Sequence, residues 1–133
     1  MQDDIAFLTA TELVALYRAR KLSPVEATRA ALDAIDRHNS SLNSYCFVDH
    51  DGALAAARES ESRWQRGQPS GLIDGVPVSV KDLVLSKGMP TLRGSRLVDP
   101  AQSWDVDAPS SARLREHGGI ILGKTTTPEF GWK

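Results

Sequence analysis

The chain has 133 residues, 41% of them hydrophobic and 25% charged, which is the composition of an ordinary globular protein. This length accommodates one domain or part of a larger one, and the composition excludes a disordered or fibrous protein. The formal net charge of -1 provides no overall attraction to nucleic acid or anionic lipid. We therefore expect no direct nucleic-acid binding and no membrane association.

The N-terminal residues indicate where in the cell the protein is expected, and the single cysteine excludes an internal disulfide. Residues 1–4 are Met-Gln-Asp-Asp, acidic where a signal peptide is basic, and no long apolar stretch follows. The expected location is the cytoplasm. Cys46 has no second cysteine to pair with, and its apolar neighbours predict a buried, unreactive thiol.

Two capping signals predict helices in the first third of the chain. Thr9 followed by Glu12 forms a capping box, and the helix behind it is expected to end near residues 21–22. Residues 23–26, Ser-Pro-Val-Glu, give a stronger start signal, with a serine cap, proline at the first helical position and glutamate at the third. The apolar face of this second helix predicts an end near His38.

A short strand and a third helix are expected next. Residues 43–48 have the pattern of a strand, and Asp49 or Asp51 is placed to cap the helix that follows. That helix is expected to run to Trp64, with Gly67 as its stop.

The second half of the chain alternates apolar runs with glycine and proline. A fourth helix is predicted from near Asp107 to His117, followed by a buried strand at residues 120–122. This succession predicts an α/β fold in which N-terminal helices lead into part of a mixed sheet flanked by helices. We expect a helical lead-in over about residues 1–70 and a sheet portion over about residues 71–133, both within a single domain.

Residues 118–125 match the phosphate-loop pattern of glycine, four residues, then Gly-Lys-Thr. That pattern binds phosphate when a strand precedes the first glycine and a helix begins at the lysine. Here a helix is predicted before Gly118, the middle residues favour a strand, and Pro128 follows shortly after. We therefore expect a sheet strand and no nucleotide site.

The three histidines are His38, His50 and His117, and their separation along the chain does not match the spacing of metal ligands. We expect no metal site and no cofactor.

Residues 75–82, Gly-Val-Pro-Val-Ser-Val-Lys-Asp, end a predicted strand with a lysine. Alternation along the strand places Val76, Val78 and Val80 on one face, and Pro77, Ser79 and Lys81 on the other. A lysine at this position either extends into solvent or is desolvated, with its pKa lowered from about 10.4 toward neutrality. Strand and spacing alone do not decide between the two.

This segment resembles the one that carries the catalytic lysine in the amidase-signature family. The resemblance continues from about Leu8 to Lys133, and residues 23–26 resemble the start of that family's second N-terminal helix. Further segments with the family's order and spacing are residues 88–91, 94–95, 107–109, 123–125 and 128–131.

The resemblance implies an amide hydrolase that uses a lysine, a serine in a cis peptide linkage and a serine nucleophile. The nucleophile attacks the amide carbonyl to give an acyl-enzyme, and its proton passes through the cis serine to the neutral lysine, which returns a proton to the leaving amine. By this resemblance Lys81 is the base and acid, and the substrate is a small-molecule amide.

The two serines belong to a glycine- and serine-rich stretch that this sequence does not contain. The serine pairs at residues 40–41 and 110–111 are not framed by glycines, and the second pair is expected to cap a helix or face solvent. We assign neither Ser79 nor Ser95 as the nucleophile. The chain alone is therefore predicted to be an inactive fragment of an amidase.

Three alternatives stay open at this stage. One is a non-catalytic binding module derived from an amidase, and another is an A-type amidotransferase subunit that forms glutaminyl-tRNA. The third is a lysine that forms a Schiff base with a carbonyl compound. The oligomeric state is not predicted.

Overall fold

The computed structural model describes residues 5–132. Helices and strands alternate along the chain as predicted for an α/β fold. The elements in order are α2 (Ala10–Arg18), α3 (Pro24–Leu42), β1 (Tyr45–Val48), α4 (His50–Gln65), β2 (Pro77–Lys81), α5 (Pro109–Glu116), β3 (Ile120–Thr125) and the 3-10 helix η1 (Glu129–Gly131).

The three described strands form a mixed sheet in the order β1-β3-β2. The central strand β3 runs antiparallel to β1 and parallel to β2, and the β2 register runs from Pro77 opposite Ile120 to Lys81 opposite Thr125. This arrangement confirms the predicted part of a mixed sheet. Because β2 has only β3 beside it, its other edge is unpaired within the described residues.

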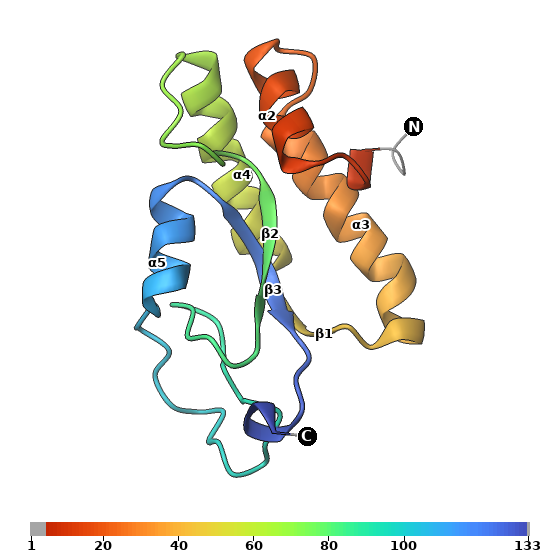
Figure 1. The fold of residues 1–133 in the computed structure, drawn as a ribbon, viewed down its shortest axis with the longest axis vertical. Coiled ribbons are helices and arrows are strands. Elements are labelled where there is room, and N and C mark those ends of the chain that lie inside the picture. Colours follow the sequence, from red (N-terminus) through yellow and green to blue (C-terminus); the bar gives the residue numbers. More distant parts are fainter. Residues whose placement is uncertain (1–4, 133) are drawn as a thin grey trace.

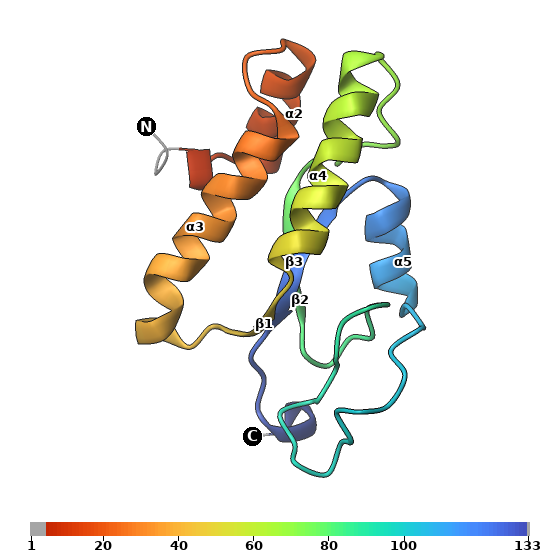
Figure 2. The same cartoon turned by 180° about the vertical axis from the view of Figure 1, so that it is seen from behind.

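Helices cover both faces of this sheet. In Figure 1 α4 lies behind the strands and α3 lies to their right, and in Figure 2, seen from behind, α4 crosses in front of them. Alternate residues of β3 pack in opposite directions: Ile120 and Leu122 contact the α3 and α4 cluster, whereas Ile121 packs with Val80 and with Leu114 of α5. A strand covered on both faces explains the continuous apolar run that predicted it.

The helix starts follow the sequence signals closely, but two ends differ. The prediction that the first helix ends near residues 21–22 is wrong, because α2 ends at Arg18 and is followed by a turn. Thr9 and Ser23 each form the predicted capping box, and Asp49 accepts the hydrogen bond that caps α4. The prediction that the second helix ends near His38 is wrong, because α3 continues to Leu42 and ends at Asn43, whose φ is +50°. The apolar face of α3 ends several residues before its helical backbone, so the hydrophobic periodicity underestimated the length of the helix.

The thiol of Cys46 is exposed, which contradicts the prediction that it is buried. Its strand β1 lies at an edge of the sheet, and the pairing of β1 with β3 is irregular between Tyr45 and Phe47. Partial desolvation and the nearby Asp82 carboxylate still raise the pKa of the thiol, which favours the unreactive protonated form.

The predicted capping or surface position of the second serine pair is wrong for Ser111. Its side chain is buried, and its hydroxyl lies 3.1 Å from the hydroxyl of Ser86. Ala108 precedes α5 and provides no side-chain cap. Asp107 instead accepts a hydrogen bond from the backbone N–H of Lys87, at 2.6 Å, and ties the segment after β2 to the start of α5.

None of the helices in residues 5–132 has the combination of length and apolar character that a membrane span requires.

Candidate active site at the ends of two parallel strands

Lys81 is the last residue of β2 and lies opposite Thr125, the last residue of β3. Because the two strands are parallel, their carboxyl ends share one edge of the sheet, the lower edge in Figure 1. This edge is where open α/β sheets place the groups that bind ligands.

The side chain of Lys81 is exposed, and its amine has no hydrogen bond or ion pair with the described residues. The predicted alternation of faces is confirmed, since Val80 is buried and Ser79 is exposed like Lys81. Of the two possibilities that the sequence leaves open, a lysine extended into solvent and a desolvated lysine, the described part of the chain shows the first. The reason is that no described element packs over the carboxyl end of the face of β2 that carries Ser79 and Lys81, whereas the opposite face, with Val80, is buried.

The buried lysine of this site is Lys124, which is 0% exposed. Its Nζ donates to Thr91 Oγ1 at 2.6 Å and to the carbonyl oxygen of Val84 at 2.7 Å, and lies 3.8 Å from Asp82 Oδ1. Burial lowers the pKa of this amine, and the Asp82 carboxylate opposes that shift.

The phosphate-loop pattern is therefore part of a strand, as predicted. Residues 120–125 form β3, and no helix begins at Lys124. A fully buried ammonium that donates to protein oxygens is not available to a phosphate.

Two of the segments that suggested the amidase-signature resemblance, residues 94–95 and 128–131, meet at this end of the fold. Ser95 Oγ donates to Glu129 Oε1 at 2.7 Å, and the Phe130 N–H donates to the Arg93 carbonyl at 2.8 Å. A Cβ on Gly94 would lie 2.7 Å from the Thr127 carbonyl oxygen, so the two segments approach closely. Motifs far apart in sequence are thus brought to one edge.

A cavity of about 270 Å³ opens at the same edge. It combines apolar walls with one buried carboxylate, that of Asp82. Its lining residues are Cys46, Phe47, Asp82, Pro90, Leu92, Gly94, Ser95 and Arg96. The hydroxyl of Ser95 is engaged with Glu129, so it is not poised as a nucleophile.

The histidines do not meet at this edge. His50 Nε2 lies 2.9 Å from Asp36 Oδ1, and both side chains are about half exposed. Among the residues that the structure describes, no three histidine, cysteine, aspartate or glutamate side chains are grouped in a way that would hold a metal ion.

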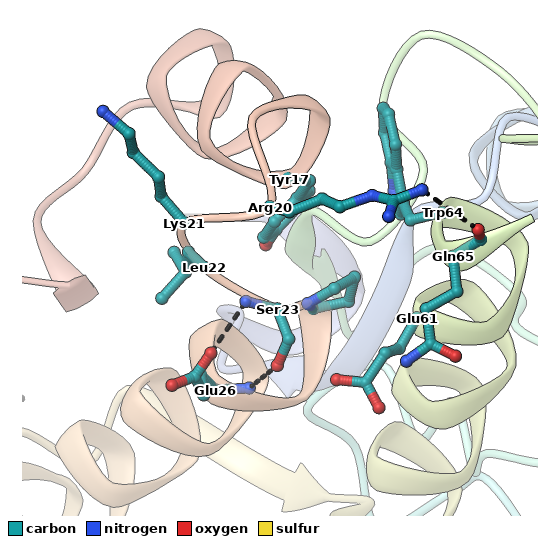
Figure 3. Close-up of a pocket in the computed structure, with 10 residues that line it drawn as sticks. Tyr17, Arg20, Lys21, Leu22, Ser23, Glu26, Glu61, Trp64 and Gln65 are labelled. Carbon is teal, nitrogen blue, oxygen red and sulfur yellow. Dashed lines mark hydrogen bonds between the residues drawn. The ribbon is translucent and has the colours of Figure 1, made fainter. Parts of the chain in front are cut away.

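A larger hollow of about 470 Å³ lies at the other end of the molecule, between the α2–α3 turn and the end of α4 (Figure 3). Several of its polar groups are already engaged. Arg20 Nη2 donates to the Gln65 carbonyl oxygen at 3.4 Å, and Ser23 and Glu26 form the cap of α3. The Tyr17 hydroxyl donates to the Gly75 carbonyl oxygen at 2.9 Å, just before β2 begins. This hollow lies between helices, near the start of β2, whereas Lys81 is at the end of that strand.

The cluster around Lys124 was not predicted from the sequence. A signal was present, because Lys124, like Lys81, follows an apolar run near the end of a strand. In the sequence Lys124 belongs to the phosphate-loop pattern, and it has no other assigned role once that pattern is excluded. Asp82 and Thr91 had no such signal, since their partner lies more than 30 residues away.

Comparison with known proteins covers the segments that form this site. The amidase family model matches residues 26–133. The chain belongs to the amidase family. Over 129 residues, 96% of its length, it is 40% identical to the A-type subunit of the glutamyl-tRNA(Gln) amidotransferase of Acidothermus cellulolyticus. It is 38% identical over 128 residues to a putative amidase, AmiD, of Mycobacterium bovis.

Solved structures of amidases share its fold. A bacterial aryl acylamidase of the amidase-signature family superimposes with a TM-score of 0.88 over 96% of this chain, at 25% identity. The native peptide amidase of Stenotrophomonas maltophilia superimposes with a TM-score of 0.84 over 94% of this chain, at 30% identity. The matches cover 26% of each of those chains.

This amidase-family chain thus spans about a quarter of the length of the curated relatives that it matches, 25% of the first and 27% of the mycobacterial protein.

Proposed function

We propose that this chain forms the lysine-bearing part of an enzyme that hydrolyses small-molecule amides, with Lys81 as its base and acid. The observation that carries the proposal is the position of Lys81 at the carboxyl end of β2, with an amine that no described residue engages, inside the segment that matches the amidase family. An amine that accepts a proton during catalysis must not be held permanently by an ion pair.

The chemistry is acyl transfer to a serine. A serine oxygen attacks the amide carbonyl while its proton passes, through a second serine in a cis peptide linkage, to neutral Lys81. The resulting ammonium returns a proton to the departing amine, which is a poor leaving group until protonated. Water then hydrolyses the acyl-serine. The family's two serines belong to a glycine- and serine-rich stretch that residues 1–133 do not contain.

In this proposal the unpaired edge of β2 is covered by further chain that carries the serines. An amine that already carries a proton cannot act as a base. Packing against the edge would exclude water from Lys81, and burial disfavours the charged form of an amine. The relatives, whose chains are about four times as long, have the residues to provide such a cover.

A second candidate is the A-type component of a tRNA-dependent amidotransferase, which the 40% identity to the Acidothermus protein favours. In such an enzyme the amide donor supplies ammonia for transfer to an acylated tRNA. Glutamine used as the amide donor, compared with aryl and peptide amides, distinguishes this candidate from a general amidase.

The test starts from the reading frame after Lys133. The expected result is a continuing frame that contains the glycine- and serine-rich stretch. The full-length polypeptide is then assayed with a panel of primary, aryl and peptide amides. Lys81→Ala is expected to lower kcat/KM by on the order of 10³-fold or more, because it removes the group that activates the nucleophile. The melting temperature of Lys81→Ala is measured beside turnover, so that a loss of activity with a cooperative melt near that of wild type is assigned to the amine and not to unfolding.

Lys87→Ala is the matched control, an exposed lysine six residues further on whose removal should leave turnover unchanged. Wild-type turnover by Lys81→Ala would disprove the assigned role. A stop codon directly after Lys133, in a chain that melts cooperatively and hydrolyses no amide, would support a non-catalytic module instead. Trapping of Lys81 by borohydride in the presence of a carbonyl compound would support the Schiff-base alternative.

A further inference from the structure

The backbone around Lys81 is fixed by two hydrogen bonds immediately after β2. The N–H of Asp82 donates to the Thr125 carbonyl oxygen, and the N–H of Val84 donates to the carbonyl oxygen of Lys81, both at 2.9 Å. The first bond continues the sheet for one residue, and the second closes a turn. The position of Lys81 at the strand end therefore depends on the turn that follows it.

Lys124, on the neighbouring strand β3, anchors this turn through hydrogen bonds. Its ammonium donates to the carbonyl oxygen of Val84, at the end of the turn, and to the hydroxyl of Thr91, seven residues later. Asp82, at the start of the turn, lies 3.8 Å from the same nitrogen and accepts the N–H of Leu92 at 3.2 Å. One buried cation thus ties both ends of the loop formed by residues 82–92 to the central strand.

A buried lysine is an unusual way to fill this space. Lysine is almost never fully buried unless its charge is paired, and desolvation of an ammonium offsets much of what its contacts contribute. A methionine of similar length would pack there without that cost, but it would specify no direction for the loop. The donors of Lys124, in contrast, fix where particular oxygens lie.

We propose that Lys124 is a positioning residue for Lys81, which sets the place of its amine at the carboxyl edge of the sheet by anchoring residues 82–92. This inference rests on the proposed function of Lys81 for its catalytic consequence. Its structural part, the anchoring of the loop, does not depend on that function.

The first arm of the test uses the 133-residue chain and amide hydrogen exchange resolved by NMR. Lys124→Met is expected to speed exchange at the N–H groups of Val84 and Leu92, which lie in the anchored loop, by on the order of tenfold or more relative to wild type. Amides in the middle of α3 should keep their wild-type rates. Lys87→Met, the replacement of an exposed lysine in the same loop, is the control and should change neither set.

A milder variant keeps the test decisive where Lys124→Met does not fold. Thr91→Val removes one acceptor, retains the cation, and is expected to speed exchange at the same two amides to a smaller extent. Wild-type exchange at Val84 and Leu92 in both variants, or in Thr91→Val where Lys124→Met does not fold, would overturn the anchoring.

The second arm uses the full-length polypeptide and separates kcat from KM. Lys124→Met, or Thr91→Val to a lesser degree, should lower kcat by up to about 10²-fold, because displacement of a reacting group by about 1 Å has that effect. KM should stay within roughly twofold, since the variant removes no group that binds the substrate directly. A rise in KM with unchanged kcat would contradict the positioning role.

The two proposals fail in different ways. If Lys81→Ala retains turnover, the proposed function fails while the exchange result for Lys124 stands on its own. If Lys81→Ala abolishes turnover but Lys124→Met and Thr91→Val have the kcat of wild type, the positioning role fails and the proposed function stands.

Discussion

Arg63 and Asp74 form a two-bonded ion pair that joins α4 to the segment in front of β2. The guanidinium donates from Nε to Oδ2 at 2.8 Å and from Nη2 to Oδ1 at 2.7 Å, and the Asp74 side chain is 0% exposed. Ser60 Oγ and the Ser70 N–H add bonds of 2.6 and 2.7 Å to the same carboxylate. The charge of Asp74 is thus fully satisfied where the chain enters the strand that carries Lys81.

Removal of the guanidinium should therefore destabilise the fold strongly. Arg63→Met leaves a buried carboxylate without its cation, which is expected to lower the free energy of unfolding by about 3 kcal/mol. The measurement is urea denaturation at neutral pH. Arg58→Met, an exposed arginine one turn earlier on α4, is the matched control and should change stability by less than about 0.5 kcal/mol. Equal effects of the two substitutions would show that the ion pair contributes little.

The same carboxylate predicts how stability depends on acid pH. Burial alone would raise the pKa of Asp74, but the hydrogen bonds from Arg63, Ser60 and the Ser70 N–H outweigh burial and hold it below its ordinary value of 3.8. A carboxylate with a depressed folded pKa stabilises the native state above the unfolded pKa. That stability is lost as the pH falls through the folded pKa, because the unfolded chain then binds more protons.

We therefore expect the wild-type free energy of unfolding to fall between about pH 5 and pH 2, with Asp74 responsible for part of the slope. Asp74→Asn has no carboxylate to titrate, so it should be less stable at neutral pH and should lose less stability on acidification. Urea denaturation of both proteins across this range measures the difference. Parallel pH profiles would rule out Asp74 as a source of the acid sensitivity.

Tyr17 also contacts the segment that leads into β2, and the contribution of its hydroxyl to stability can be measured separately. Its side chain is 2% exposed, and its hydroxyl donates to the Gly75 carbonyl oxygen. Tyr17→Phe leaves that buried carbonyl without this donor and is expected to cost about 1–2 kcal/mol of stability in thermal or urea unfolding. Tyr45→Phe is the control, because the Tyr45 hydroxyl has no hydrogen bond with any described residue. A cost as small for Tyr17→Phe as for the control would contradict the prediction.

Local signals in the sequence were sufficient to predict the helices and strands, but not the buried polar contacts between them. The caps at Thr9, Ser23 and Asp49 involve residues three apart, so composition and spacing predict them directly. The bonds from Arg63 to Asp74 span 11 residues and join two elements. No local pattern distinguishes Arg63 from Arg58, the exposed arginine of the same helix.

The site was predicted in part for the same reason. The face on which Lys81 lies follows from strand alternation, which is a local property. Its exposure depends on what packs over that face of β2, which is set by the tertiary structure. The burial of Lys124 likewise depends on a loop from residues 82–92 that folds over β3, so only the tertiary structure distinguishes the two strand-end lysines.

Gly94 and Gly67 offer a matched pair that tests the close approach of the two site loops. Both have a positive φ, +65° and +69°, so alanine is strained at either position. At Gly67 an added Cβ would have no atom within 4 Å, whereas at Gly94 it would lie 2.7 Å from the Thr127 carbonyl oxygen, a backbone atom that cannot swing aside. Gly67→Ala should therefore cost about 1 kcal/mol, the backbone penalty alone.

Gly94→Ala should cost that penalty and the free energy of moving residues 127–129 away, a total of about 2–4 kcal/mol in urea denaturation, because overpacking adds about 1–3 kcal/mol. In the full-length polypeptide it should also lower turnover, since the displaced segment lies at the edge that carries Lys81, while Gly67→Ala should leave turnover intact. Equal stability of the two alanine variants would show that the loops tolerate a wider separation and that their close contact is not required by the fold.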